Sequence, residues 1–442
     1  RLAERGMPKE PPRASWAPRF KPGPADAEAP LADTEGARGA RGFADRTFFG
    51  PADTEEDGRE VVQEPYEEPQ KNERSFTAPR DWRRARGRGT EMSADNPRVS
   101  QKHAAEPANG GPPDGDGHIS PNVQAIDRFR ITKMIDKGTF GTVFKAWDTK
   151  WKESVAIKVV RKVKRYVSDG EFEVGILDEL AELDREGRYC VKLYKYFHYQ
   201  GHFCIVTELL GKSLYHSLKQ LRQAGQSVSM SAIRRIAYQL CKALQFLRSV
   251  RLVHADLKTE NILLARPDMS LDDKDLTVRL IDFGGATWEE DTHSRLIQTR
   301  HYRAPEVVLG LEWSFPCDMW SVGCILLELY ESRLTFDTHD TAQHLAMINR
   351  LSGDFPGELI AKIPRDHSVS RMFDSSHRLR WPDISTGRSQ EEAVYKVNPV
   401  ANRIQSQHGD FRDLVESMLE IDPLRRVRPD EALRSEFLRD AA

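Results

Sequence analysis

The spacing of apolar residues changes once along the chain, near residue 210, and this change limits the possible folds more than any other feature. Before it, short apolar runs lie around glycine-containing turns and predict β-strands, with a single segment at helical spacing. After it, apolar residues recur at helical spacing. We therefore expect an α+β fold in which a small β-rich lobe precedes a larger, mainly helical lobe, with a cleft between them. The predicted strands are 126–148 (a hairpin), 153–160 and 202–210, and the predicted helices are 171–184, 229–249, 316–331 and 411–422.

The first part of the chain differs in composition from the rest. Residues 1 to about 120 are rich in Pro, Gly, Ala, Glu and Arg and contain few branched apolar residues. Such a segment cannot bury enough surface to offset the entropy of ordering. We therefore expect a disordered tail over 1–120, with a folded N-terminal domain as the alternative, and one folded domain over 121–440, divided into lobes at 128–210 and 211–440. Because the chain starts with Arg1, we expect it to be a fragment of a longer protein.

The net charge and the short apolar runs argue against a protein that binds nucleic acid or membranes through its overall charge and against one that spans a membrane. The net charge of -2 gives no general attraction to nucleic acid or to membranes, and no stretch approaches the roughly 20 apolar residues of a membrane helix. One basic cluster, "DWRRARGRG" (81–89), fits either a nuclear-import or nucleic-acid patch or a solvated charge run. The five cysteines are an odd number without CxxC spacing, which favours reduced thiols in an intracellular protein.

A polar cluster between two apolar runs, "LVHADLKTENILLA" (252–265), carries the first chemical signal. Asp256 could accept a proton from a hydroxyl group. Lys258 could neutralise charge on a transferring group, and the carbonyl oxygen of Asn261 suits Mg²⁺. Taken alone, this is a polar loop, and many polar loops are only structural.

Three further stretches supply the groups that such chemistry needs. Asp282, in "LIDFGGA", follows an apolar run and precedes a glycine, which is a good position for a second metal ligand. The turn "KGTFGTV" (137–143) can bring backbone N–H groups close to phosphates. Lys158 lies inside an apolar strand, where a lysine is costly unless paired, and Glu173 on the following helix is its expected partner. The alternative for Lys158 is a lysine at the sheet edge with its amine in solvent.

In this order, "VAIK", "HADLKTEN", "DFG" and "APE" resemble the signature set of the eukaryotic protein kinases, over about residues 126–440. The resemblance implies the bilobal kinase fold and transfer of the γ-phosphoryl group of ATP to a protein hydroxyl, with ATP and Mg²⁺ as cofactors. Asp256 would be the catalytic base, Lys258 would stabilise the transferring phosphoryl group, and Asn261 and Asp282 would hold Mg²⁺. The nucleotide pocket would be formed by Lys158, Glu173, Gly138, Gly141, Val143, Ala156, Thr207 (the gatekeeper), Glu208 and Leu210.

The resemblance also implies three supporting contacts. Thr299 would bridge the catalytic base and the neighbouring lysine and help to position a Ser/Thr substrate. Glu306 would pair with Arg426, and Asp318 would brace the catalytic loop.

Two positions depart from the kinase pattern. Asp136 replaces the first glycine of the glycine-rich loop, which adds a negative charge near the phosphates but removes no catalytic group. Ala255 replaces the arginine that most kinases have before the catalytic Asp and that commonly meets a phosphorylated residue of the activation loop. Since alanine makes no charge-assisted bond, we expect the enzyme not to require that phosphorylation.

Two stretches, "QTRHYRAPEVVLG" (298–310) and "QHLAMINRLSG" (343–353), are similar to the CDC-like (LAMMER) kinases. This resemblance implies a divergent member that phosphorylates Ser/Thr of Arg/Ser-rich splicing factors, regulates pre-mRNA splicing and autophosphorylates, including on Tyr. It also implies a nuclear location, with the cytoplasm as a second one, and a monomeric kinase domain that binds protein substrates without membrane or direct nucleic-acid contact. The acidic stretch "WEEDTH" (288–293) fits either a site for a basic substrate or a solvated turn.

Three other interpretations stay open. A related branch, the dual-specificity tyrosine-regulated kinases or the SR-protein kinases, would fit most of the same motifs. A pseudokinase scaffold is favoured only by Asp136 and Ala255, because every catalytic group is present. Nucleic-acid binding through residues 81–89 could coexist with catalysis.

Overall fold

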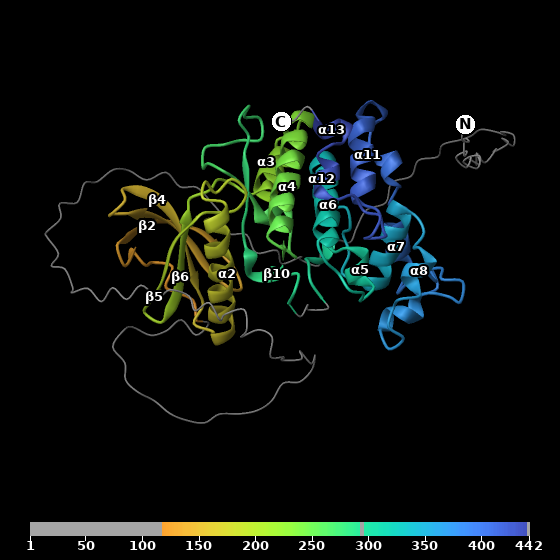
Figure 1. Cartoon of the computed structure of the whole chain (residues 1–442), viewed down its shortest axis with the longest axis horizontal. Coiled ribbons are helices and arrows are strands. Elements are labelled where there is room, and N and C mark those ends of the chain that lie inside the picture. The colour runs from red at the N-terminus through yellow and green to blue at the C-terminus, as the bar shows by residue number, and fades with distance from the viewer. Residues whose placement is uncertain (1–116, 292–295, 440–442) are drawn as a thin grey trace, which may run out of the picture. The chain divides into compact units, whose positions relative to one another are not determined.

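The computed structural model describes residues 117–291 and 296–439 (Figure 1). Residues 1–116 of the tail predicted over 1–120, including the basic cluster at 81–89, lie outside the described residues. In the described part, a β-sheet comes first in the chain and a helical region follows it, as the apolar spacing predicts. None of the described helices combines the length and the apolar character needed to cross a membrane.

Six strands form one antiparallel sheet in the order β1-β2-β3-β4-β6-β5. One face of this sheet carries a buried apolar cluster that includes Phe129, Phe144 and Ile157. The hairpin and the strand at 153–160 are confirmed, and the last predicted strand ends at Glu208 instead of residue 210. The strands are β1 (Ala125–Ile126), β2 (Phe129–Lys137), β3 (Gly141–Asp148), β4 (Glu153–Val160), β5 (Leu193–Tyr199) and β6 (His202–Glu208).

The helix α2 (Lys164–Leu183) begins earlier than the predicted residue 171. Its N-cap residue, Val163, makes no capping hydrogen bond, and Gly170 lies inside the helix, so the sequence lacks a start signal there. Packing accounts for the glycine, because a Cβ atom at Gly170 would lie 3.1 Å from the ring of Phe203 on β6. The glycine therefore lets α2 pack closely against the sheet.

Helices fill most of the region after β6 (Figure 1). The helix α4 (Met230–Ser249) is capped by Ser229, whose hydroxyl accepts a hydrogen bond from the backbone N–H of Ala232 (3.2 Å). The helix α6 (Pro316–Glu331) has the predicted bounds and is buried along most of its length. The helix α11 (Gly409–Met418) ends before the predicted residue 422, which precedes a proline and so disfavours helix. The other helices are α3 (Leu214–Gln223), α5 (Pro305–Val308), α7 (Thr341–Ser352), α8 (Gly357–Ile360), α9 (Arg388–Tyr395), α10 (Val400–Arg403), α12 (Pro429–Ala432) and α13 (Glu436–Arg439).

Two small antiparallel pairs position the loops of the site. The strand β7 (Leu252–Val253) pairs with β10 (Thr287–Trp288), and β8 (Ile262–Leu264) pairs with β9 (Val278–Leu280). The loop between β7 and β8 contains the polar cluster seen in the sequence, and the residues after β9 include Asp282. Short 3₁₀ turns lie at η1 (Thr259–Asn261), η2 (Phe283–Gly285), η3 (Arg300–Tyr302), η4 (Ser368–Met372) and η5 (Ser406–His408).

Backbone hydrogen bonds join the two lobes beside this loop. Leu280 on β9 accepts from the N–H of Val191 (2.9 Å) and donates to the carbonyl of Tyr189 (2.9 Å), in the segment between α2 and β5. Apolar residues of α2, including Ile176 and Leu177, belong to the same core cluster as the helical lobe. These contacts hold α2 next to the residues that follow β9. All five cysteines are buried free thiols, as expected.

Candidate active site

A buried carboxylate fixes the backbone of the loop that follows β7. Asp318, at the start of α6, accepts hydrogen bonds from the backbone N–H groups of His254 (2.8 Å) and Ala255 (3.0 Å), which is the brace expected for it. Burial raises the pKa of Asp318, and these N–H groups act in the opposite direction. Ala255 has a φ of 62°, a left-handed conformation that costs about 1–2 kcal/mol for a residue with a Cβ atom. The bonds to Asp318 help to hold this conformation.

Asp256, Lys258 and Thr299 form one hydrogen-bonded group. The Nζ atom of Lys258 lies 2.7 Å from Oδ2 of Asp256 and 3.2 Å from Oγ1 of Thr299. Oδ1 of Asp256 accepts from both the backbone N–H (3.0 Å) and the hydroxyl (2.7 Å) of Thr299. The bridge expected for Thr299 is therefore present, and it orients the carboxylate of Asp256.

A second group brings together Lys158, Glu173 and Asp282. The Nζ atom of Lys158 lies 2.7 Å from Oε2 of Glu173 and 3.6 Å from Oδ1 of Asp282. Burial alone would lower the pKa of Lys158, but the charges of the two carboxylates outweigh it and raise that pKa above its ordinary value. Burial would likewise raise the pKa of Asp282, but the nearby cations, Lys158 first, hold it below its ordinary value. Lys158 is therefore a paired, charged lysine and not a lysine with its amine in solvent.

The donor set fits a hard divalent ion. Asn261 donates through its Nδ2 to the carbonyl of Asp256 (2.9 Å), which leaves its side-chain oxygen for a metal ion. The carboxylate of Asp282 is 39% exposed. An amide oxygen and a carboxylate oxygen suit Mg²⁺, which takes oxygen ligands from few side chains and from substrate phosphates. Among the described residues, no cluster of three or more His, Cys, Asp or Glu side chains could form a closed metal cage.

Four of the residues expected around the nucleotide share one face of the sheet. The strand register pairs Val143 with Lys158, and Ala156 with Thr207. Because side chains alternate along a strand and paired residues share a face, these four side chains lie on the face opposite the buried apolar cluster. Glu208 ends β6 and accepts from the backbone N–H of Lys192 through its carboxylate (2.8 Å). Leu210 follows β6 and is buried.

The glycine-rich turn between β2 and β3 lies against the end of β4. The N–H of Gly138 donates to the carbonyl of Gly141 (3.0 Å), and Arg161 donates to the carbonyl of Phe140 (3.0 Å). A Cβ atom at Gly141 would lie 2.3 Å from the carbonyl oxygen of Val159, so only glycine fits there. The carboxylate of Asp136 is turned back onto the neighbouring N–H of Lys137 (2.8 Å).

The acidic stretch at 288–293 is paired within the domain in its described part. Arg251 contacts Oε2 of Glu289 (2.8 Å) and Oε1 of Glu290 (3.3 Å), and Ser314 also donates to Glu289 (3.3 Å). Part of the negative charge of this stretch is thus already paired with an arginine of the same domain. The other expected structural pair, Glu306 with Arg426, is bidentate (2.7 and 2.9 Å) and buried.

The sequence analysis missed a buried acid next to the catalytic loop. Glu328, on α6, is 5% exposed and accepts a hydrogen bond from the hydroxyl of Tyr302 (2.6 Å), which lies 3.1 Å from Oγ1 of Thr259. Burial raises the pKa of Glu328 to about 7, although the Tyr302 hydrogen bond favours ionisation, and the charge of Glu260 raises it further. A glutamate inside an otherwise apolar helix destabilises the fold. Its position in the apolar run of α6 was therefore the sequence signal that could have pointed to a functional role.

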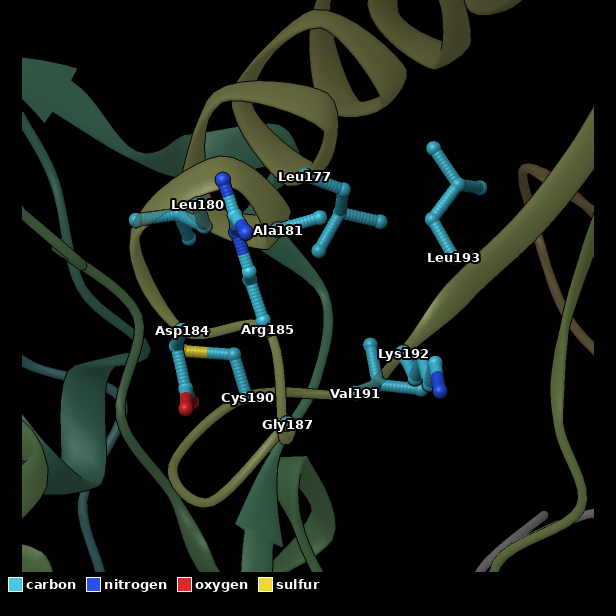
Figure 2. Close-up of a pocket in the computed structure, with 10 residues that line it drawn as sticks. All are labelled: Leu177, Leu180, Ala181, Asp184, Arg185, Gly187, Cys190, Val191, Lys192 and Leu193. Atoms are coloured by element: carbon cyan, nitrogen blue, oxygen red, sulfur yellow. The ribbon is translucent and has the colours of Figure 1, made fainter.

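Glu328 also lines a pocket of about 400 Å³ between α3 and α6, with Tyr215, Leu218, Lys219, Arg222 and Gln223. A second pocket, of about 180 Å³, lies where α2 ends and the chain leads into β5 (Figure 2). Its lining is apolar except for Asp184, Arg185 and Lys192, and it includes none of the predicted site residues. The second pocket is therefore separate from the groups described above.

Comparisons with known proteins agree with this geometry. Residues 129–438 match the protein kinase domain family. The chain is 37% identical to the serine/threonine-protein kinase AFC2 of Arabidopsis thaliana, over 74% of this chain and 82% of that protein. It is also 37% identical to the dual specificity protein kinase CLK1 of Mus musculus, over 73% of this chain and 69% of that protein. A crystal structure of a kinase domain superposes with a TM-score of 0.68 at 33% identity and covers 74% of this chain and all of the other. The chain therefore belongs to the protein kinase family, as a divergent CLK/LAMMER-type kinase of serine/threonine or dual specificity.

Proposed function

We propose that this kinase uses ATP and Mg²⁺ to phosphorylate serines in Arg/Ser-rich splicing factors and thereby regulates pre-mRNA splicing in the nucleus. The family uses ATP and a divalent metal ion in general; the choice of Mg²⁺ rests on the amide and carboxylate oxygens of Asn261 and Asp282. The substrate class rests on the resemblance to the CDC-like kinases and on one observation, the acidic pair of Glu260 and Glu328 beside the catalytic loop.

The site residues divide the work of phosphoryl transfer between them. Asp256, oriented by Thr299, accepts the proton of the substrate hydroxyl. Lys258 and Lys158 would neutralise negative charge on the phosphate oxygens. The ion pair with Glu173 fixes the amine of Lys158. A bound Mg²⁺ supplies further neutralisation of the phosphate oxygens.

The acidic pair favours a cationic substrate residue near the phosphorylated serine. Glu260 lies in η1 within the catalytic loop, and Glu328 reaches the same loop through Tyr302 and Thr259. The charge of Glu260 raises the pKa of Glu328, so a cation placed near both carboxylates relieves a repulsion present in the free enzyme. A guanidinium group fits best, because its planar fork binds two carboxylate oxygens at once.

The first test compares two peptides. Phosphate incorporation from ATP and Mg²⁺ is measured with an Arg-Ser repeat and with the same repeat carrying Gln in place of Arg, using Asp256→Asn as the inactive control. We expect labelling of the Arg-Ser peptide that depends on Asp256, and at least about tenfold lower kcat/KM for the Gln-Ser peptide, the equivalent of one charge-assisted hydrogen bond. Equal labelling of both peptides would retain the kinase and refute the substrate class.

A further inference from the structure

A buried glutamine lies immediately before Thr299, the residue that orients the catalytic base. Gln298 is 7% exposed and has a φ of 63°, an unusual conformation for a residue with a side chain. A buried amide without hydrogen-bond partners would destabilise the fold. The hydrogen bonds of the Gln298 amide therefore show what holds the residue in this conformation.

The side chain of Gln298 uses both ends of its amide on the helical lobe. Its Nε2 donates to the carbonyl of Cys317 (2.9 Å) and to Oγ of Ser321 (2.9 Å), both on α6. Its Oε1 accepts from the backbone N–H of Ala304 (2.9 Å), at the start of α5. The amide thus ties the last part of the activation segment, the stretch from Asp282 to Glu306, to α6 and to Ala304, the residue before α5.

The backbone of Gln298 connects the same position to the catalytic loop. Its N–H donates to the carbonyl of Ala255 (3.0 Å), whose own N–H is held by Asp318 on α6. One residue further along each segment, the N–H of Thr299 donates to Asp256 (3.0 Å). The two segments therefore meet in two consecutive hydrogen bonds, and α6 anchors both of them.

We propose that Gln298 is a positioning residue that holds Thr299 against Asp256 and replaces the link that a phosphorylated activation loop makes in kinases with an arginine at position 255. The link here is formed by uncharged groups. It involves no phosphate, because the amide of Gln298 bonds directly to α6. The inference is independent of the proposed substrate class, because it concerns the orientation of the base for any hydroxyl substrate.

The test is the Gln298→Ala variant, with Gln298→Glu as a second variant that keeps the side-chain size and the acceptor for Ala304. Steady-state kinetics are normalised to the concentration of nucleotide-binding sites and use the Ser/Thr peptide that the wild-type enzyme labels best. We expect kcat to fall about 10- to 100-fold in both variants, because both lose the two donations to α6 and a small misplacement of the reacting groups is enough for such a loss. The KM for ATP should stay within about twofold, since the nucleotide groups do not contact Gln298.

The matched control is Gln239→Ala. Gln239, on α4, also makes three amide hydrogen bonds, to the carbonyls of Arg235 and Leu276 and from the N–H of Val278, but none of them reaches Asp256 or Thr299. This variant should lose thermal stability and keep its kcat per site. If Gln298→Ala behaved like the control, with lower stability and unchanged kcat, the positioning role would be refuted. A wild-type enzyme that ignores Arg-Ser peptides would refute only the substrate proposal, since the comparison uses its best peptide.

Discussion

Replacing Glu328 by glutamine should stabilise the protein and weaken its binding of basic substrates. The change keeps the size of the side chain, and the amide oxygen can still accept the hydrogen bond from Tyr302. What it removes is a carboxylate that is 5% exposed and lies near the charge of Glu260. An acid kept at a stability cost is expected where the charge serves binding or catalysis.

The size of the stabilisation follows from the pKa of Glu328, which burial raises from an ordinary 4.5 to about 7. Because the folded protein holds this proton more tightly than the unfolded chain, wild-type stability carries no penalty from Glu328 below pH 4.5 and declines as the pH rises through about 7. The full penalty is roughly 3 kcal/mol, at 1.36 kcal/mol per pKa unit. Glutamine does not titrate, so the Glu328→Gln variant should exceed the wild type by roughly 1 kcal/mol at pH 5 and roughly 3 kcal/mol at pH 8.

Urea unfolding of both proteins at pH 5 and pH 8 measures this difference directly. Glu392→Gln is the control: Glu392 is an exposed glutamate on α9 whose ion pair within the described residues is with Arg388, and its replacement should change stability by less than about 1 kcal/mol at either pH. The kinetic counterpart is a KM for the Arg-Ser peptide at least about tenfold higher in Glu328→Gln. A stability gain that does not grow with pH would show that Glu328 is not a buried acid with a raised pKa, and an unchanged KM would remove it from substrate binding.

Four further outcomes test the other features of the site. Asp282→Asn should lower turnover about 10³-fold while ATP binding persists, as measured by single-turnover phosphorylation and nucleotide titration. Glu306→Gln should cost about 3–5 kcal/mol in urea unfolding, because it leaves the buried guanidinium of Arg426 without its carboxylate; a loss below about 1 kcal/mol would contradict the importance of that pair. Asp136→Gly should lower the KM for ATP about two- to fivefold by removing a charge near the phosphates. Phosphatase treatment should leave kcat unchanged, since Ala255 offers no cation to a loop phosphate; activity that is lost and then restored by rephosphorylation would overturn this.

Elements defined by neighbouring residues were predictable. The bounds of β4 and α6 match the sequence prediction because each combines an apolar run with local stop signals, and α6 begins at Pro316, which favours a first helical turn. The pair of Lys158 and Glu173 was predictable because a lysine inside an apolar strand needs an anion, and the next helix offers one. In each case, the residue that needs a boundary or a partner and the residue that supplies it lie on the same element or on the next one.

The start of α2 was not predictable from its own residues. The segment from Lys164 to Gly170 contains a β-branched valine, a serine, an aspartate and a glycine and has no capping side chain, so local propensity does not favour a helix there. The helix forms because Gly170 allows close packing on Phe203, a residue more than thirty positions away. Tertiary packing overrides propensity in this segment, and a single sequence does not show that packing.

The activation segment makes the same point for function. Ala255 alone predicts that a loop phosphate has no cation to bind, but it does not say what holds the segment instead. The structure places Arg251 against Glu289 in the first part of the segment and Gln298 against α6 in its last part. The residues in these contacts are 19 to 38 positions apart in the sequence. Segments tied down by such contacts lose their conformational entropy when the domain folds, and not when a phosphate is added. In the described parts of the segment, on either side of residues 292–295, little ordering energy is therefore left for phosphorylation to supply.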